Sequence, residues 1–142
     1  MIAKALGLSG SNASHFDDVT ENTSCAGYIN ALAEVGLVQG TGNGRFCPDQ
    51  TLTRQDFYTL LARMMRYLNL NWEYASRKVT QEQLDRMNAL GFAHWADDDA
   101  ALLELAEMVD FDSGMVEPAE GIRRGEAAAG MYAMLASAGV LY

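Results

Sequence analysis

The sequence predicts a mainly α-helical fold built from helix–loop–helix repeats. Three observations support this prediction: apolar residues recur at helical spacing, Thr-x-x-Asp and Thr-x-x-Gln patterns mark helix starts, and part of the sequence recurs about 70 positions later. The chain has 142 residues, of which 49% are hydrophobic and 20% charged, as expected for a globular protein. No apolar run approaches the roughly twenty residues that a membrane-spanning helix needs.

The first half of the chain contains parts of three predicted helices. The N-terminal MIAKAL segment has the spacing of the last turns of a helix, and Gly7 with the Ser- and Asn-rich run that follows ends it. A second helix is predicted from about Cys25 to Val35. The third begins at Thr53 and has the longest apolar stripe: Phe57, Leu60, Leu61, Met64, Met65 and Leu68.

The second half begins with a connector, 69–77, in which Trp72 and Tyr74 are expected to fold back over the core. Thr80 and Gln83 form a capping-box pattern that opens the next helix, which ends before Gly91. Two further helices are predicted from the spacing of small and apolar residues: Leu102, Leu105, Ala106 and Val109 for the first, Met131, Met134 and Leu135 for the second.

The stretch 36–57, GLVQGTGNGRFCPDQTLTRQDF, joins the second and third helices. Its glycines and Asn43 tolerate the positive φ of a tight reversal, and Thr53 with Asp56 forms a capping box. Arg54 lies between the two capping residues, although capping requires no arginine there. Without further information Arg54 is read either as a binding residue or as a surface arginine that pairs with Asp49 or Asp56.

Part of this pattern recurs later in the chain. Leu-Ala-Glu at 32–34 recurs at 105–107, and four residues of the loop recur 70 positions later. These pairs are Pro48 and Pro118, Leu52 and Ile122, Arg54 and Arg124, and Asp56 and Glu126. The second copy is therefore expected to be three residues shorter in its loop and to lack the TGNG turn.

The repeats suggest the following organisation. Residues 1–8 are the tail of a preceding repeat, since MIAKAL resembles LLARMM at 60–65. Residues 16–70 are a well-matched repeat, 71–90 a connector with a short helix, and 91–142 a degenerate repeat. The chain is read as a segment of something longer.

The net charge of −9 arises within 97–120, which contains nine acidic residues and no Lys or Arg. This stretch is interpreted as a solvated acidic face, and the charge argues against a nucleic-acid partner. The triple Asp lacks the alternating oxygen ligands and glycine of a calcium loop, so no metal and no cofactor is predicted. Cys25 and Cys47 show no CxxC spacing; each is expected to be a small buried residue, with a bridge between them left open.

The repeat resembles the S-layer homology (SLH) family. The resemblance rests on four elements in order: Phe16 with Asp18-Val19, then Gly36-Leu-Val-Gln-Gly40, Gly44-Arg-Phe-Cys-Pro48 and Leu52-Thr-Arg-Gln-Asp56. The second copy matches more weakly, through Trp95-Ala96, Gly114, Pro118 and Ile122-Arg-Arg-Gly-Glu126. The resemblance implies mostly helical repeats that pack as a pseudo-threefold unit or a partial bundle with short irregular loops.

The resemblance also implies a function. SLH modules hold surface proteins on bacterial cell walls by binding an anionic secondary cell-wall polysaccharide, often one with a pyruvate ketal. The family's binding arginine maps onto Arg54 and Arg124, and the resemblance implies Gly40 and Gln39 as further glycan contacts. A guanidinium can donate two parallel hydrogen bonds to a planar carboxylate, such as that of a pyruvate ketal. The start of the helix is expected to add free backbone donors to the site. Thr53, Asp56 and Glu126 support the site as helix caps.

Departures from the family pattern favour Arg54 over Arg124. The second copy has Arg123 at the cap position and Gly125 in the first turn, and it follows the acidic stretch. Trp95 is expected to pack in the core or an interface, with a role as an aromatic glycan contact as the alternative.

The sequence shows no catalytic constellation around His15 or His94, so the chain is predicted not to be an enzyme. The predicted location is the cell wall or S-layer outside the cell. The alternative function is a protein-interaction or self-assembly scaffold made of degenerate SLH repeats.

Overall fold

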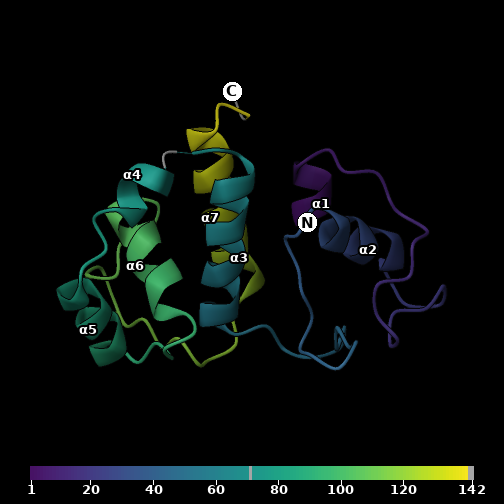
Figure 1. Ribbon diagram of the computed structural model, residues 1–142, viewed down its shortest axis with the longest axis horizontal. Helices are drawn as coiled ribbons and strands as arrows, with labels where there is room; N and C mark the ends of the chain where they lie inside the picture. Colours follow the sequence, from purple (N-terminus) through teal and green to yellow (C-terminus); the bar gives the residue numbers. More distant parts are fainter. Residues whose placement is uncertain (71, 141–142) are drawn as a thin grey trace. The chain divides into compact units, whose positions relative to one another are not determined.

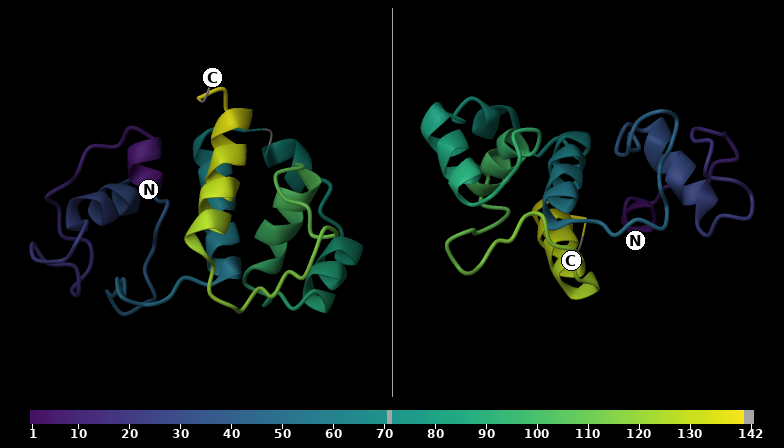
Figure 2. Two further views of the ribbon diagram at one scale, coloured as in Figure 1. Left: turned by 180° about the vertical axis from the view of Figure 1, so that it is seen from behind. Right: turned by 90° about the horizontal axis from the view of Figure 1, so that it is seen from below.

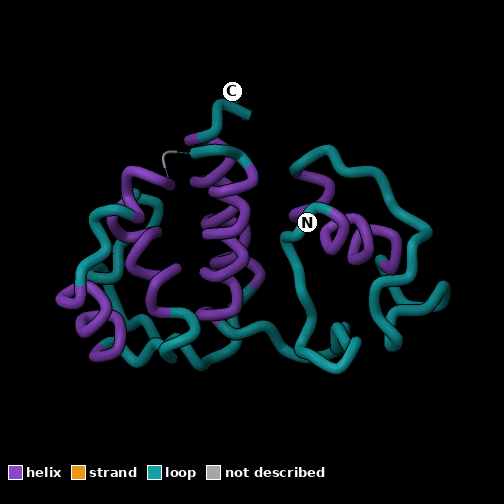
Figure 3. Tube along the Cα trace, in the orientation of Figure 1, coloured by secondary structure: helices purple, strands orange, loops and turns teal. Residues whose placement is uncertain are grey.

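The computed structural model describes residues 1–70 and 72–140 and is mainly helical, as the sequence predicts (Figures 1 and 3). No strand occurs in these two ranges. The chain divides into two compact units, an N-terminal unit, Met1–Gln50, and a C-terminal unit, Thr51–Tyr142. The boundary falls between the glycine-rich loop and the helix that follows it.

The N-terminal unit contains α1, Ile2–Ala5, and α2, Ala26–Glu34, which pack against each other. The C-terminal unit contains five helices in the described residues, and Figure 2 shows α3 and α7 running side by side. Their bounds are α3 Arg54–Tyr67, α4 Trp72–Ser76, α5 Gln81–Ala89, α6 Asp97–Leu105 and α7 Arg124–Ser137.

The internal repeat is visible in the helix lengths. Helices α2 and α6 both have 9 residues, and α3 and α7 both have 14. The connecting segments, 35–53 and 106–123, have 19 and 18 residues. The predicted three-residue shortening is therefore wrong, because the Leu-Ala-Glu match at 105–107 places the second helix two residues too late.

The helices end in a common way. In the described part of the chain, six of them are followed at the second position beyond the helix by a residue with positive φ: Gly7, Gly36, Asn69, Gly91, Glu107 and Gly139. The next amide then bonds back to the helix, as in Leu37 N–H to Leu32 O and Met108 N–H to Leu103 O, both 2.9 Å. Glu107 reaches a φ of 58° without being glycine.

Helix α6 corrects the sequence prediction in this region. It begins at Asp97 and ends at Leu105, so Val109 lies outside it and three aspartates form its first turn. Carboxylates at a helix start interact favourably with the helix dipole, which stabilises this early beginning. Its residues Ala100 to Leu103 are all buried, so the helix is apolar on more than one face and the one-sided spacing rule missed its extent.

The core of the C-terminal unit confirms the predicted α3 stripe, since Phe57, Leu61, Met64 and Met65 are all buried. Beside it lies an aromatic cluster of Tyr58, Phe92 and Phe111, with ring centroids 5.2 to 6.0 Å apart. Such pairs add to the stabilisation that comes from burial itself.

The connector after α3 is partly helical, because α4 occupies Trp72–Ser76. Tyr74 does not fold back over the core, as its side chain is 65% exposed and lies under the Lys78 ammonium at 4.1 Å from the ring centroid. Position 71 of the predicted connector lies outside the described residues. The capping pattern at Thr80 is present, with its N–H donating to Gln83 Oε1 at 2.8 Å.

Gly130 on α7 allows close packing of α7 against α3. A Cβ added there would lie 2.9 Å from the Phe57 ring and 3.2 Å from Leu61. We expect Gly130→Val to lower the free energy of unfolding of the C-terminal unit by about 1–3 kcal/mol, as overpacking does. Chemical denaturation monitored by circular dichroism measures this change.

Gly125→Ala is the matched control for Gly130→Val. An added Cβ at Gly125 meets nothing within 4 Å, and the residue lies in the first turn of α7. Alanine is the better helix former, so this variant should be more stable by about 0.5–1 kcal/mol. Equal destabilisation of the two variants would contradict the close packing at Gly130.

Candidate functional site

The start of α3 carries the first predicted site. Thr53 Oγ1 accepts the N–H of Asp56 at 3.2 Å, while Asp56 Oδ2 accepts the N–H of Thr53 at 3.0 Å. These two bonds form the capping box that the sequence pattern describes. They fix the first turn of α3 and thereby the position of Arg54.

The backbone donors of this helix start are already used. Arg54 N–H donates to Glu120 O and Gln55 N–H to Pro118 O, both at 2.9 Å. In return, Ile122 N–H donates to Leu52 O at 2.9 Å. The expectation that the α3 start offers free backbone donors is wrong, because a turn from the second copy of the repeat occupies them.

The Arg54 guanidinium is also engaged. Its Nε and Nη2 donate to the two carboxylate oxygens of Glu126 at 2.9 and 3.3 Å, and Nη1 lies 3.6 Å from Glu117 Oε2. Its side chain is only 13% exposed. The sequence predicted Asp49 or Asp56 as the partner of Arg54, and this prediction is wrong. The Arg54 guanidinium instead pairs with Glu126, 72 positions further along the chain.

The pair also changes the acid–base properties of its members. The hydrogen bond from Arg54 lowers the pKa of Glu126, and the Arg123 N–H, which Glu126 accepts at 3.0 Å, lowers it further. The same hydrogen bond raises the pKa of Arg54. Burial raises the pKa of Tyr58 nearby. Arg54 and Glu126 therefore remain an ion pair at neutral pH.

Arg124, the equivalent residue on α7, is in the opposite situation. It is exposed, and within ranges 1–70 and 72–140 its guanidinium has no ion-pair partner. The amides of Arg124 and Gly125 likewise have no acceptor among the described residues. The cap is half a capping box, since Glu126 accepts the Arg123 N–H but an arginine side chain cannot accept in return.

The glycine-rich loop of the N-terminal unit contains Gly40 and Gln39, both exposed. Gly40 has a φ of 74°, and a Cβ added there would lie 2.3 Å from Arg45 O and 2.7 Å from the Phe16 ring. The loop is held by Asp18, whose two carboxylate oxygens accept the N–H groups of Phe46 and Cys47, each at 2.8 Å. Sequence reasoning quoted Asp18 only as part of a motif and missed this role.

The N-terminal unit is expected to lose stability in acid through Asp18. The Phe46 and Cys47 amides lower the pKa of Asp18 below its ordinary value of 3.8, against the effect of burial. A carboxyl whose pKa is lower in the folded than in the unfolded state stabilises the fold, and this contribution is fully present above the ordinary pKa of 3.8. It is lost as the pH falls through the pKa of the folded state. Hydrogen exchange of the Phe46 and Cys47 amides across this range measures the loss.

Asp18→Asn is the control for the acid effect. An amide keeps one acceptor oxygen but carries no charge, so protection of the loop should be weaker at neutral pH and nearly independent of pH below 3.8. An Asn variant with the same acid dependence as the native chain would show that another carboxyl is responsible.

Other predicted residues are placed as follows. The side chain of Trp95 is 57% exposed, so it is not a core residue. Cys25 is exposed and Cys47 partly exposed, and both are free thiols rather than buried residues or a bridge. His94 Nδ1 lies 3.3 Å from Asp97 Oδ2, but no cluster of metal-ligating side chains occurs in the described residues.

The acidic stretch is less of an open face than expected, because arginines neutralise part of it. Arg86 pairs with Glu104 and Asp112, each at 2.8 Å, and Arg66 pairs with Asp99 at 2.7 Å. Asp97 is buried and accepts the Asp98 N–H at 2.7 Å and the Asn88 amide at 3.2 Å. The interpretation as a solvated face is therefore wrong for Asp97, Asp99 and Glu104, whereas the side chain of Asp112 is exposed.

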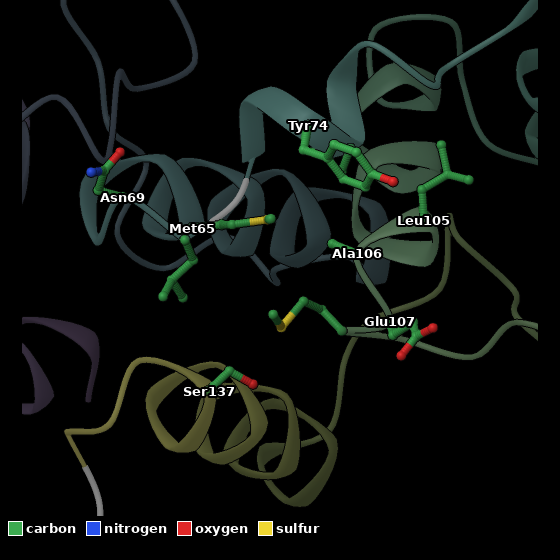
Figure 4. A pocket seen from close by; sticks show the side chains of 10 residues that line it. Met65, Asn69, Tyr74, Leu105, Ala106, Glu107 and Ser137 are labelled. Carbon is green, nitrogen blue, oxygen red and sulfur yellow. The ribbon is translucent and has the colours of Figure 1, made fainter.

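A cleft of about 350 Å³ lies near the C-terminal ends of α3, α6 and α7. Figure 4 shows Tyr74 and Ser137 on opposite sides of it, with Met65 and Leu105 among its apolar residues. Glu107 is the one charged residue of its lining in the described chain. The Ser137 hydroxyl in this lining donates to the Ala133 carbonyl at 2.9 Å, and no hydrogen bond joins it to Glu107 among the described residues, so the cleft shows no paired base and nucleophile.

Comparison with known proteins supports the motif analysis. The family model of the S-layer homology domain matches residues 15–57. A cell surface protein of Thermoanaerobacter kivui is 31% identical over 87 residues, which cover 61% of this chain and 11% of that protein. The chain thus spans a small part of that relative's length. None of the described helices is long and apolar enough to cross a membrane.

Proposed function

We propose that this chain, whose residues 15–57 match the family model of the S-layer homology domain, anchors a longer protein to the bacterial cell wall by binding an anionic secondary cell-wall polysaccharide. The family match supports a cell-surface anchoring module, and domains of this kind are non-catalytic. The similarity to a cell surface protein supports the same location.

The observation that carries the proposed binding mode is the open helix start at Arg124. A planar carboxylate, such as that of a pyruvate ketal, can accept two parallel hydrogen bonds from an exposed guanidinium. The Arg124 and Gly125 amides, without an acceptor in the described chain, add donors at the positive end of α7. The polysaccharide would therefore gain hydrogen bonds from the guanidinium and from the two backbone amides without breaking any existing one.

Arg54 contributes differently in this proposal. It would have to release Glu126 before it could bind a glycan carboxylate, so we assign the resting site to Arg124 and regard Arg54 as a structural residue. We further propose that the exposed Trp95 indole stacks on a sugar ring. Gly40 and Gln39 are proposed to contact glycan hydroxyls from the N-terminal unit.

Co-sedimentation with purified bacterial cell walls tests the function. The chain is expected to pellet with native walls and to remain in solution after chemical removal of the secondary polysaccharide. Binding should weaken as ionic strength rises, because an exposed guanidinium is screened by salt. Undiminished binding to stripped walls would overturn the polysaccharide as the ligand.

A further inference from the structure

The exposed indole of Trp95 lies on a short turn, residues 93–96, within the C-terminal unit. The Ala96 N–H donates to Ala93 O at 2.9 Å, which closes the turn. Phe92 before the turn and Ala96 at its end are both buried, so the indole stands out between two anchored positions. A binding side chain is effective when its backbone is held in place before the ligand arrives. The contacts that hold this turn therefore determine how the indole meets a ligand.

Gln55 holds the turn from α3. Its side-chain Oε1 accepts the Ala93 N–H at 3.0 Å, a contact between residues 38 positions apart. The bond is partly buried, so its surroundings are less polar than water and the hydrogen bond is correspondingly stronger. Asp97 Oδ2 lies 3.3 Å from His94 Nδ1, but this contact reaches only an exposed side chain of the turn. The Gln55 bond reaches the backbone itself.

Gln55 also contacts a second turn, residues 117–120, through its own backbone. The Gln55 N–H donates to Pro118 O in this turn at 2.9 Å, and the chain continues from the turn to Arg124. The segment before the first turn also packs here, since a Cβ added to Gly91 would lie 3.5 Å from Pro118 Cδ. One residue of α3 therefore joins the two segments that carry or precede the proposed glycan contacts of the C-terminal unit.

We propose that Gln55 is the positioning residue for Trp95, because its side chain fixes the turn in which the indole meets a sugar ring. The inference rests on the proposed function, in which Trp95 stacks on the wall polysaccharide. The capping box of α3 uses Thr53 and Asp56, so the helix start does not require the Gln55 side chain. Ordering a loop during binding costs free energy, and a turn that is ordered beforehand avoids this cost. Gln55 thus acts through the turn and not by contact with the glycan.

Time-resolved fluorescence anisotropy of Trp95 tests the positioning directly. Trp72 is the other tryptophan of the chain, so a Trp72→Phe background leaves Trp95 as the single reporter. Gln55→Leu removes the acceptor of the Ala93 N–H while it remains a good helix former, so the indole should become more mobile. Gln55→Glu keeps an acceptor oxygen and should restore the native anisotropy decay. An indole that is equally mobile in all three chains would overturn the proposal.

Co-sedimentation with native cell walls measures the consequence for binding. Gln55→Leu and Trp95→Ala should each bind about twofold to tenfold more weakly, since stacking on a sugar ring is expected to contribute about as much as an aromatic pair. Gln81→Leu is the matched control, because it makes the same substitution in the first turn of α5, where the side chain donates to Asp85 of the same helix at 2.8 Å. This control should bind like the native chain. Thermal unfolding ensures that folded chains are compared.

The double variant decides whether Gln55 acts through Trp95. If it does, Gln55→Leu should cause no further loss of binding once Trp95 has been replaced by alanine, because the effects of coupled residues do not add. Losses that add, or native binding by a folded Gln55→Leu chain, would overturn the positioning role alone. A native chain that does not pellet with walls would instead overturn the proposed function.

Discussion

Replacing Arg124 by alanine is expected to weaken binding to polysaccharide-bearing walls by about tenfold to a hundredfold, since a hydrogen bond to a charged group contributes about 1.5–3 kcal/mol. The stability of the C-terminal unit should change little, because Arg124 is exposed and has no ion-pair partner in the described residues. Co-sedimentation over a series of wall concentrations measures the affinity, and thermal unfolding measures the stability.

Arg54→Ala is the matched comparison, because both substitutions remove an arginine at the first position of a 14-residue helix. Here the expected loss is in stability: the variant leaves Glu126 and Glu117 near each other without their shared cation. Its wall binding should follow the fraction of folded protein. If Arg54→Ala abolished binding in a fully folded chain while Arg124→Ala bound normally, the assignment of the two arginines would be reversed.

Gly40→Ala is expected to disrupt the N-terminal unit. The added Cβ would lie 2.3 Å from the Arg45 carbonyl oxygen, a backbone atom that cannot move aside as a side-chain end can. We expect a loss of about 1–3 kcal/mol from overpacking, and about 1–2 kcal/mol more because alanine disfavours a left-handed backbone. Hydrogen exchange should show lost protection at the amides of Asp17 and Thr41, which bond to this loop at 2.8 Å.

Gly36→Ala separates the two causes. Gly36 has nearly the same φ, 75°, but a Cβ added there meets nothing within 4 Å. It should therefore lose only the conformational part, about 1–2 kcal/mol. If both variants lost the same hydrogen-exchange protection at these amides, the close approach to the Arg45 carbonyl would not contribute to the destabilisation. If Gly36→Ala lost wall binding while the 40–45 loop kept its protection, a residue other than Gly40 would be needed to explain the binding by this unit.

The sequence predicted those features that depend on near neighbours in the chain. The α3 stripe, the capping residues Thr53 and Gln83, and the glycines that end helices are all local patterns, and the structure contains them. The start of α6 was missed because its first residues are acidic rather than apolar. Only the packing of Ala100 to Leu103 against other helices shows that the helix continues there.

The environment of the two arginines could not be predicted in this way. The local motif around Arg54 is better formed than that around Arg124, and it favoured Arg54 as the binding residue. The contact that occupies Arg54 comes from Glu126, and no local spacing rule reports on residues so far apart. Asp18 is a similar case, since its partners Phe46 and Cys47 lie 28 and 29 positions away.

The capping of α3 by the 117–120 turn also has a consequence for biosynthesis. When α3 leaves the ribosome, the carbonyls of Pro118 and Glu120 that accept its first amides have not yet been translated. Domains are made from the N-terminus at about 5–20 residues per second, so the amides of Arg54 and Gln55 wait several seconds for these acceptors, although the local capping box of Thr53 and Asp56 can already form. During that interval its apolar stripe lacks α6 and α7, and the nascent C-terminal unit depends on contacts that form only near the end of synthesis.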